Sequence, residues 1–136
     1  NALTVNLHLL MVSFFRPSGK RTKILIEKPA FPSDRYAVAS QLGFHGLDPA
    51  EHLIEVEPRQ SEHWLREGDI AETIDEHGAN IALILLPGVQ YYSGQVLDMK
   101  AITERGHAHG CIVGFDLAHA IGNIPLALHD WDVDFA

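Results

Sequence analysis

The sequence predicts an α/β fold in which a mostly parallel β-sheet carries helices on both faces. After one helix at the amino end, short apolar runs typical of buried strands alternate four times with segments typical of helices. Such alternation indicates parallel strands joined by right-handed helical crossovers. No internal repeat, low-complexity tract or interior linker interrupts the pattern, so residues 1–136 are expected to belong to a single domain.

Composition narrows the class of protein. With 136 residues, 46% hydrophobic and 21% charged, the chain is expected to form a globular domain with one core. The formal net charge of -8 argues against a nucleic-acid partner, because such proteins need a basic face. A single cysteine, Cys111, excludes a disulfide framework and suits a reducing compartment. No apolar run reaches the roughly 18 residues that a membrane span needs, so we expect a cytoplasmic protein with no membrane partner.

The ends of the sequence suggest a longer parent protein. The chain begins at Asn1 without an initiator methionine and stops at Ala136, where a new apolar stretch begins. We therefore expect a domain that is incomplete at both ends.

Residues 1–15 predict the first helix. Its apolar positions cover a broad face, which indicates a buried helix that ends at Arg16-Pro17-Ser18-Gly19. The free N–H groups and positive dipole of its first turn could bind a phosphate, with the Thr4 hydroxyl adding a donor. The alternative is that Asn1 or Thr4 only caps the helix.

Residues 22–26 (TKILI) predict a buried strand, and residues 27–34 (EKPAFPSD) predict the loop at its carboxyl end. Two prolines stiffen this loop, which would present Phe31, Ser33 and Asp34 to a ligand crevice. The alternative is that Phe31 belongs to the core and that Asp34 caps a helix over residues 35–42.

The middle of the chain predicts an edge strand and a central strand. Residues 53–56 (LIEV) are only weakly apolar and precede Pro58, which is typical of an edge. A solvated connector over residues 60–67 leads to a helix over residues 69–77, with Asp69 and Glu72 as a capping box. Residues 81–86 (IALILL) predict the central strand, which ends at Pro87-Gly88.

The loop after this central strand carries Tyr91, Tyr92 and Ser93, whose hydroxyl groups are available at the same crevice. A helix is predicted over residues 98–109. Residues 111–115 (CIVGF) then predict another buried parallel strand, with Asp116 at its carboxyl end. His119 follows at i+3, so a helical turn would place its imidazole beside Asp116 in one pocket wall before Gly122 and Asn123 break the turn.

Other combinations of residues are weaker signals. His107 and His109 could join Asp116 and His119 at a metal, but histidines at a helix end are favoured by the helix dipole alone. Asp130, Asp132 and Asp134 resemble the start of a calcium loop, yet Phe135 stands where that loop needs glycine. Cys111 starts a buried strand and is interpreted as a small hydrophobic residue. Glycine fingerprints of dinucleotide and P-loop sites are absent, and we predict no metal.

An acid at a strand end, an aromatic face and a phosphate-binding helix end together indicate pyridoxal 5'-phosphate. Its pyridine nitrogen withdraws electrons when protonated, and a nearby carboxylate keeps it protonated. Asp116 would be that carboxylate, while His119 would orient Asp116 or pack beside the ring. Phe31 would stack on the ring, and Thr4 with the helix N-terminus would hold the phosphate.

Several segments also resemble one enzyme family over essentially the whole chain. The resemblance is to the kynureninase family, whose members are fold-type I pyridoxal-phosphate enzymes. It is carried by the segments NALTVNLHLLMVSFF, KILIEKPAFPSDRYA, GVQYYSGQ, GFDLAHAIGN and LHDWDVDFA. The resemblance implies that the chain is part of the cofactor-binding large domain. It also implies cofactor contacts at Leu3, Thr4, Phe31, Pro32, Ser33, Asp34, Asp116 and His119. Tyr92 matches a family tyrosine near the phosphate, whereas Pro87 replaces a serine of the animal enzymes.

The resemblance implies hydrolysis of L-kynurenine or its 3-hydroxy form to the corresponding anthranilate and L-alanine, in tryptophan catabolism and NAD biosynthesis. It also implies a homodimer that binds a small amino-acid substrate. The family's Schiff-base lysine would follow Ala136, so this segment alone is expected to be inactive. The alternatives are a cysteine desulfurase-like or aminotransferase-like enzyme of the same fold, or a non-catalytic α/β module that binds an anion or a protein.

Overall fold

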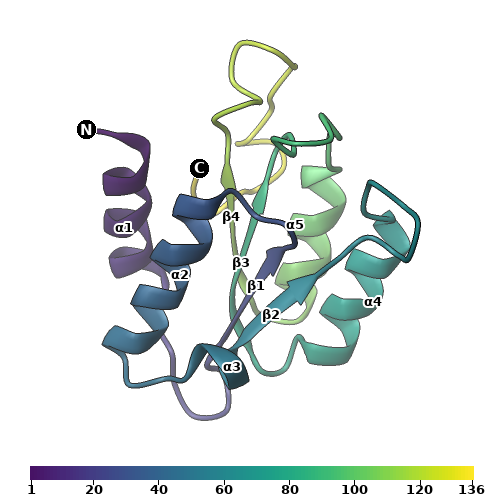
Figure 1. Cartoon of the computed structure of the whole chain (residues 1–136). Helices are drawn as coiled ribbons and strands as arrows, with labels where there is room; N and C mark the ends of the chain where they lie inside the picture. The colour runs from purple at the N-terminus through teal and green to yellow at the C-terminus, as the bar shows by residue number, and fades with distance from the viewer.

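The computed structural model describes residues 1–136 and contains one four-stranded parallel sheet with the order β2-β1-β3-β4 (Figure 1). The order confirms that the third strand is central and the second lies at an edge. Predicted and observed strand bounds agree to within one residue. The strands are β1 (Lys23–Glu27), β2 (Leu53–Val56), β3 (Ile81–Pro87) and β4 (Ile112–Asp116).

Helices cover both faces of the sheet, as predicted (Figure 1). One core cluster joins the sheet to α1 (Leu3–Phe14) and α2 (Pro32–Phe44), and the other joins it to α4 (Glu67–His77) and α5 (Met99–Ala108). The sequence did not predict the short helix α3 (Pro49–His52), which leads into β2. After β4 the chain forms turns, so the alternation of strand and helix ends there.

Helix α1 corrects two predictions. Its N-cap is Ala2 without a side-chain cap, so neither Asn1 nor Thr4 caps it. It is buried along one face only: Leu7 and Met11 lie in the core, Leu10 and Phe14 are partly buried against it, and the apolar side chains of the outer face are exposed. The reason is that this chain packs the sheet, α2 and Phe135 against one face of α1 and leaves the opposite face uncovered. The exposed side chains are those of Leu3, Val5, Leu9 and Val12.

Two other helices begin earlier than predicted. Pro32 opens α2, a position that suits its fixed φ, and Phe31 is the N-cap, so Asp34 lies in the first turn and caps nothing. Helix α4 begins at Glu67 with Arg66 as N-cap, and the predicted capping box at Asp69 is wrong. Asp69 instead accepts hydrogen bonds from the guanidinium of Arg59, which come as close as 2.7 Å.

The connector over residues 60–67 is only partly solvated. Leu65 is 4% exposed and packs into the core. Its backbone N–H donates to the side chain of Gln95 at 2.8 Å, and its carbonyl accepts from the same side chain at 2.7 Å. This exchange ties the connector to the loop that follows β3.

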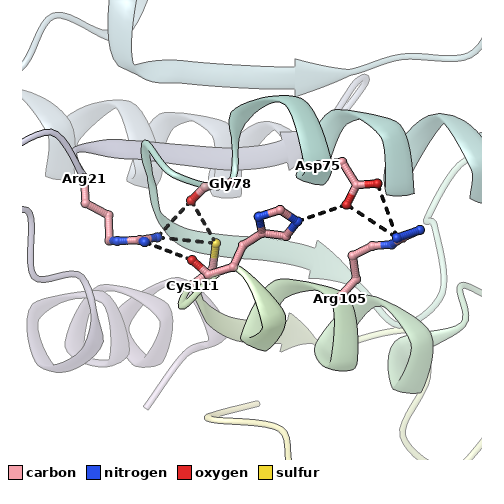
Figure 2. Close-up of polar contacts among 6 residues, drawn as sticks. Arg21, Asp75, Gly78, Arg105 and Cys111 are labelled. Carbon is pink, nitrogen blue, oxygen red and sulfur yellow. Dashed lines mark hydrogen bonds and ion pairs between the residues drawn. The ribbon is translucent and has the colours of Figure 1, made fainter.

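Arg21, just before β1, forms hydrogen bonds with the ends of α4 and α5, the two helices on one face of the sheet. Its guanidinium donates to the carbonyl oxygens of Gly78 at 2.8 Å, Ile81 at 2.9 Å and His109 at 2.9 Å. Figure 2 shows the guanidinium beside Gly78 and Cys111, with Asp75 and Arg105 continuing the polar network between α4 and α5. Because Gly78 ends α4 and His109 ends α5, one cation satisfies carbonyl groups at two helix C-termini.

None of the helices is both long enough and apolar enough to pass through a lipid bilayer.

Candidate functional site

A pocket of about 60 Å³ opens at the carboxyl ends of three strands. Glu27 ends β1, Pro87 ends β3 and Asp116 ends β4, and all three line the pocket. The chain order of the strands changes direction between β1 and β3, and ligands of open α/β sheets bind at such a switch point. The full lining is Leu3, Glu27, Phe31, Asp34, Pro87, Val89, Tyr91, Asp116, Ala118 and His119.

Asp116 and His119 share a wall of this pocket, which confirms their predicted proximity. Asp116 Oδ1 accepts a hydrogen bond of 2.7 Å from the backbone N–H of Ala118. The chain then makes one tight turn, in which the N–H of Ile121 donates to the carbonyl of Leu117 at 2.9 Å. This turn presents the exposed imidazole of His119 at the rim.

Three carboxyl groups meet in the pocket, and no lysine or arginine lines it. The pKa of Glu27 is raised to about 7: burial is the main cause, a hydrogen bond from its own backbone opposes it, and the charges of Asp34 and Asp116 add to it. Burial, followed by a hydrogen bond to Asp116 and its charge, raises the pKa of Asp34 to about 7. Like charges in a poorly solvated space cannot all ionise, so the pocket holds protons near neutral pH and is suited to a cation.

Two aromatic side chains, those of Phe31 and Tyr91, also line the pocket. Phe31 packs edge-to-face on Tyr91, with ring centroids 5.1 Å apart and an angle of 84° between the rings. Phe31 remains 42% exposed, so the alternative that it is a core residue is wrong. Its position suits contact with a planar ligand.

Some of the predicted site residues lie outside the lining of the pocket. Thr4, Pro32 and Ser33 are close to it in sequence but do not line it. Ser33 Oγ donates to Asp34 Oδ1 at 3.2 Å and therefore acts on the pocket through that acid. Tyr92 is 78% exposed, and its neighbour Tyr91 occupies the wall instead.

Glu27 is the site residue that sequence reasoning missed. It stands directly after the apolar run of its strand, as Asp116 stands after CIVGF, so the same signal was present. The structure contains no group of three or more histidine, cysteine, aspartate and glutamate side chains arranged to hold a metal ion. Asp134 instead accepts a hydrogen bond of 2.7 Å from Val113 N and lies 2.8 Å from His107 Nε2.

Comparison with known families identifies the relatives of this fold. The model of the family described as aminotransferase class-V matches residues 23–136, which include both strand-end acids, Glu27 and Asp116. The chain belongs to the aminotransferase class-V family. This family is one of pyridoxal-phosphate enzymes.

Among curated proteins, kynureninases align with this chain over its whole length. The kynureninase of Nematostella vectensis is 59% identical over 136 residues, which cover 100% of this chain and 29% of that protein. The kynureninase of Koribacter versatilis is 60% identical over 136 residues, again 100% of this chain and 32% of that protein. The chain therefore spans about three-tenths of the length of the relatives it matches.

Solved structures confirm the predicted fold class. A C-DES mutant with glycine covalently linked to its PLP cofactor superimposes with a TM-score of 0.78 at 19% identity, covering 98% of this chain and 34% of that one. The cysteine desulfurase of Thermococcus onnurineus NA1 gives 0.73 at 18% identity, covering 98% and 32%. At such identities the likeness concerns the fold alone.

Proposed function

We propose that the protein containing this chain hydrolyses L-kynurenine or 3-hydroxy-L-kynurenine to anthranilate or 3-hydroxyanthranilate and L-alanine, with pyridoxal 5'-phosphate as cofactor. The observation that carries the proposal is the identity of 57–60% to kynureninases over all 136 residues. In this proposal, residues 1–136 are part of the cofactor-binding large domain.

The pocket suits the pyridine end of this cofactor. Its acids have no lysine or arginine partner among the lining residues, and a protonated ring nitrogen would supply a positive charge there. Phe31 exposes an aromatic surface beside them. When bound, the cofactor provides an electron sink for the carbanion that forms at the substrate Cα.

The roles of the side chains follow from their positions. Asp116 pairs with the ring nitrogen and keeps its proton in place, while the hydrogen bond from Ala118 N fixes the orientation of the carboxylate. Asp34 hydrogen-bonds to Asp116 and supports it from α2.

The remaining contacts surround this acid pair. His119 packs at the rim, and Phe31 contacts the ring. The first turn of α1 lies at the same end of the sheet and offers its free N–H groups to the phosphate (Figure 1). The similarity to kynureninases supports further cofactor contacts at Leu3, which lines the pocket, and at Thr4, Pro32 and Ser33 beside it, with Tyr92 near the phosphate.

The test uses the full-length protein and three competing chemistries. Loaded with pyridoxal 5'-phosphate, it is incubated with L-kynurenine, with 3-hydroxy-L-kynurenine, with L-cysteine, or with L-alanine and a 2-oxo acid. We expect equimolar anthranilate-type product and alanine from the first two. Sulfide alone would assign the protein as a desulfurase, and transamination products alone as an aminotransferase. Binding of pyridoxal phosphate without turnover of any of these substrates would favour a non-catalytic binding module.

We also propose that the protein is a cytoplasmic homodimer. The acidic composition and single free cysteine support a reducing compartment. The uncovered face of α1, where Leu9 is 55% and Val12 is 58% exposed, supports further packing in the assembled protein. Sedimentation of the full-length protein measures the oligomeric state.

A further inference from the structure

Glu27 is a buried carboxyl group with no partner in another residue. Its side chain lies at the end of β1, is only 6% exposed and lines the pocket with Asp34 and Asp116. The only hydrogen bond to its carboxyl group comes from its own backbone. No buried side-chain oxygen or nitrogen of the structure lacks a hydrogen-bond partner. The carboxyl group of Glu27 still has no partner in another residue, so in the lining of a ligand pocket it is free to respond to the charge of a ligand.

The surroundings of Glu27 are acidic on the side of the site. On its other side is a second, smaller hollow, where the one lysine, Lys28, is directed outward to Glu57 at 2.9 Å. No cation is therefore paired with Glu27. The titratable groups that line the two hollows with it are Asp34, Tyr91, Asp116 and His119 on the site side, and Lys28, His63 and Tyr92 on the other.

Because of this arrangement, Glu27 is partly protonated near neutral pH. With a pKa of about 7, raised first by burial, Glu27 is half protonated at pH 7 and almost fully protonated at pH 6. A positive charge in the pocket would favour the ionised carboxylate and lower that pKa. Occupation by a cation must then displace the proton, because the two effects are thermodynamically linked.

We propose that Glu27 is a positioning residue of the cofactor site, which holds a proton in the free pocket and releases it to solvent when a pyridinium ring pairs with Asp116. Binding breaks the O–H bond of the neutral Glu27 acid and that of the neutral Asp34 acid, and both protons go to solvent. The acid triad thereby selects a cationic aromatic ring over a neutral one of the same shape. This inference rests on the proposed cofactor and adds a residue that acts through Asp116.

The test counts protons released on binding to the full-length apoprotein. Titration calorimetry in phosphate and in Tris, whose ionisation enthalpies differ, gives the number of protons exchanged per site. The two ligands are pyridoxal 5'-phosphate and its 1-deaza analogue, in which C–H replaces the ring nitrogen. The difference between them cancels the protons exchanged at the aldehyde and the phosphate.

For the wild type we expect pyridoxal 5'-phosphate to release more protons than the analogue between pH 6 and 7.5. The excess should approach two near pH 6, one each from Glu27 and Asp34, and shrink as pH rises because both acids have a pKa of about 7. In Glu27→Gln the excess should fall by about half. The matched control, Glu57→Gln, changes an exposed acid that follows the neighbouring strand and should behave as the wild type.

The outcomes separate the inference from the proposed function. Failure of the wild type to bind pyridoxal 5'-phosphate overturns the proposed cofactor and the inference with it. Binding with the same proton count in Glu27→Gln as in the wild type overturns the role of Glu27 alone. If Glu27→Gln does not fold, the wild type decides. An excess of one proton or fewer near pH 6 refutes the inference, because Asp34 alone accounts for it, and an excess near two that decreases with pH supports it.

Discussion

The carboxylate of Asp116 is held by the backbone of Ala118, whose N–H donates to Oδ1 at 2.7 Å. This hydrogen bond fixes one carboxylate oxygen, and because the group is planar it also sets the direction of the other oxygen. An amide in place of the carboxylate can still accept this hydrogen bond but carries no charge. Substitution of Asp116 by asparagine therefore removes the charge of this side chain while keeping its orientation.

We expect Asp116→Asn in the full-length protein to lower kynurenine cleavage by about 10²-fold or more, because loss of a charge aimed at a reacting group typically has that effect. Asp116→Ala should abolish cleavage. Circular dichroism should show both variants folded, since Asp116 lies at the end of its strand and not in the core. Activity of Asp116→Asn within a few-fold of the wild type would rule out the assigned role.

Phe31 and Phe115 make a matched pair of phenylalanines. Phe31 is 42% exposed at the pocket, and Phe115 is 1% exposed in the core. Phe31→Ala should weaken pyridoxal 5'-phosphate binding with little change in the melting temperature of the apoprotein. Phe115→Ala should lower the free energy of unfolding by about 3 to 5 kcal/mol. A large loss of apoprotein stability in Phe31→Ala would show that its ring is structural.

The free energy of unfolding of the apoprotein should fall as pH rises from about 4.5 to 7. Below pH 4.5 Glu27 is protonated in both states. Between 4.5 and its folded pKa of about 7 only the folded state keeps the proton, so raising the pH favours unfolding, and above 7 the fall stops. The full shift corresponds to about 3 kcal/mol.

Urea denaturation at pH 5 and at pH 7.5 measures this slope. Because other groups also titrate in this interval, the comparison is between the wild type and Glu27→Gln, which cannot ionise. The variant should have the smaller decrease in stability between the two pH values. Identical slopes would mean that Glu27 titrates normally in the folded state.

Arg21→Ala should destabilise the protein by about 2 to 3 kcal/mol, since it removes charge-assisted hydrogen bonds to buried carbonyl groups. Arg21→Lys should recover only part of the loss, because an ammonium cannot reach the separate carbonyls of Gly78 and His109 as a planar fork does. Cofactor affinity should be unchanged in the folded protein, as Arg21 lies at the opposite end of the strands. A shift in affinity would reveal coupling between the two ends of the sheet.

No lysine lines the pocket. Borohydride reduction of the full-length protein in the presence of pyridoxal 5'-phosphate should therefore attach the cofactor to a lysine outside residues 1–136. Peptide mass spectrometry locates the label. Stoichiometric labelling of Lys20, Lys23, Lys28 or Lys100 would contradict the proposed alignment with kynureninases.

The sequence predicts the sheet well and the helix ends poorly, for physical reasons. A continuous apolar run such as IALILL can bury all its side chains only as a strand with helices on both faces of the sheet, which makes β3 predictable. A potential capping side chain can also bind other partners: Asp69 accepts a hydrogen bond from Arg59 and does not cap its own helix. The outer face of α1 is apolar in composition, but what covers it is not encoded within this chain.

The site is predictable in part. The acid after an apolar run locates Asp116, and the same rule applied to β1 would have found Glu27. Which of two adjacent tyrosines faces the pocket depends on the loop conformation. Gln90 sets it by accepting hydrogen bonds at 2.8 Å from the backbone of Tyr92 and of Ser93. No local pattern in the sequence indicates that choice.

The position of β3 between β1 and β4 also bears on the folding order. Glu27 and Asp116 lie far apart in the chain, and only the insertion of β3 brings their strands into one sheet. Such non-local pairing is slow, so the acids converge late, after hydrophobic contacts have formed around the central strand. We therefore expect the mutual repulsion of these acids to accelerate unfolding more than it slows folding.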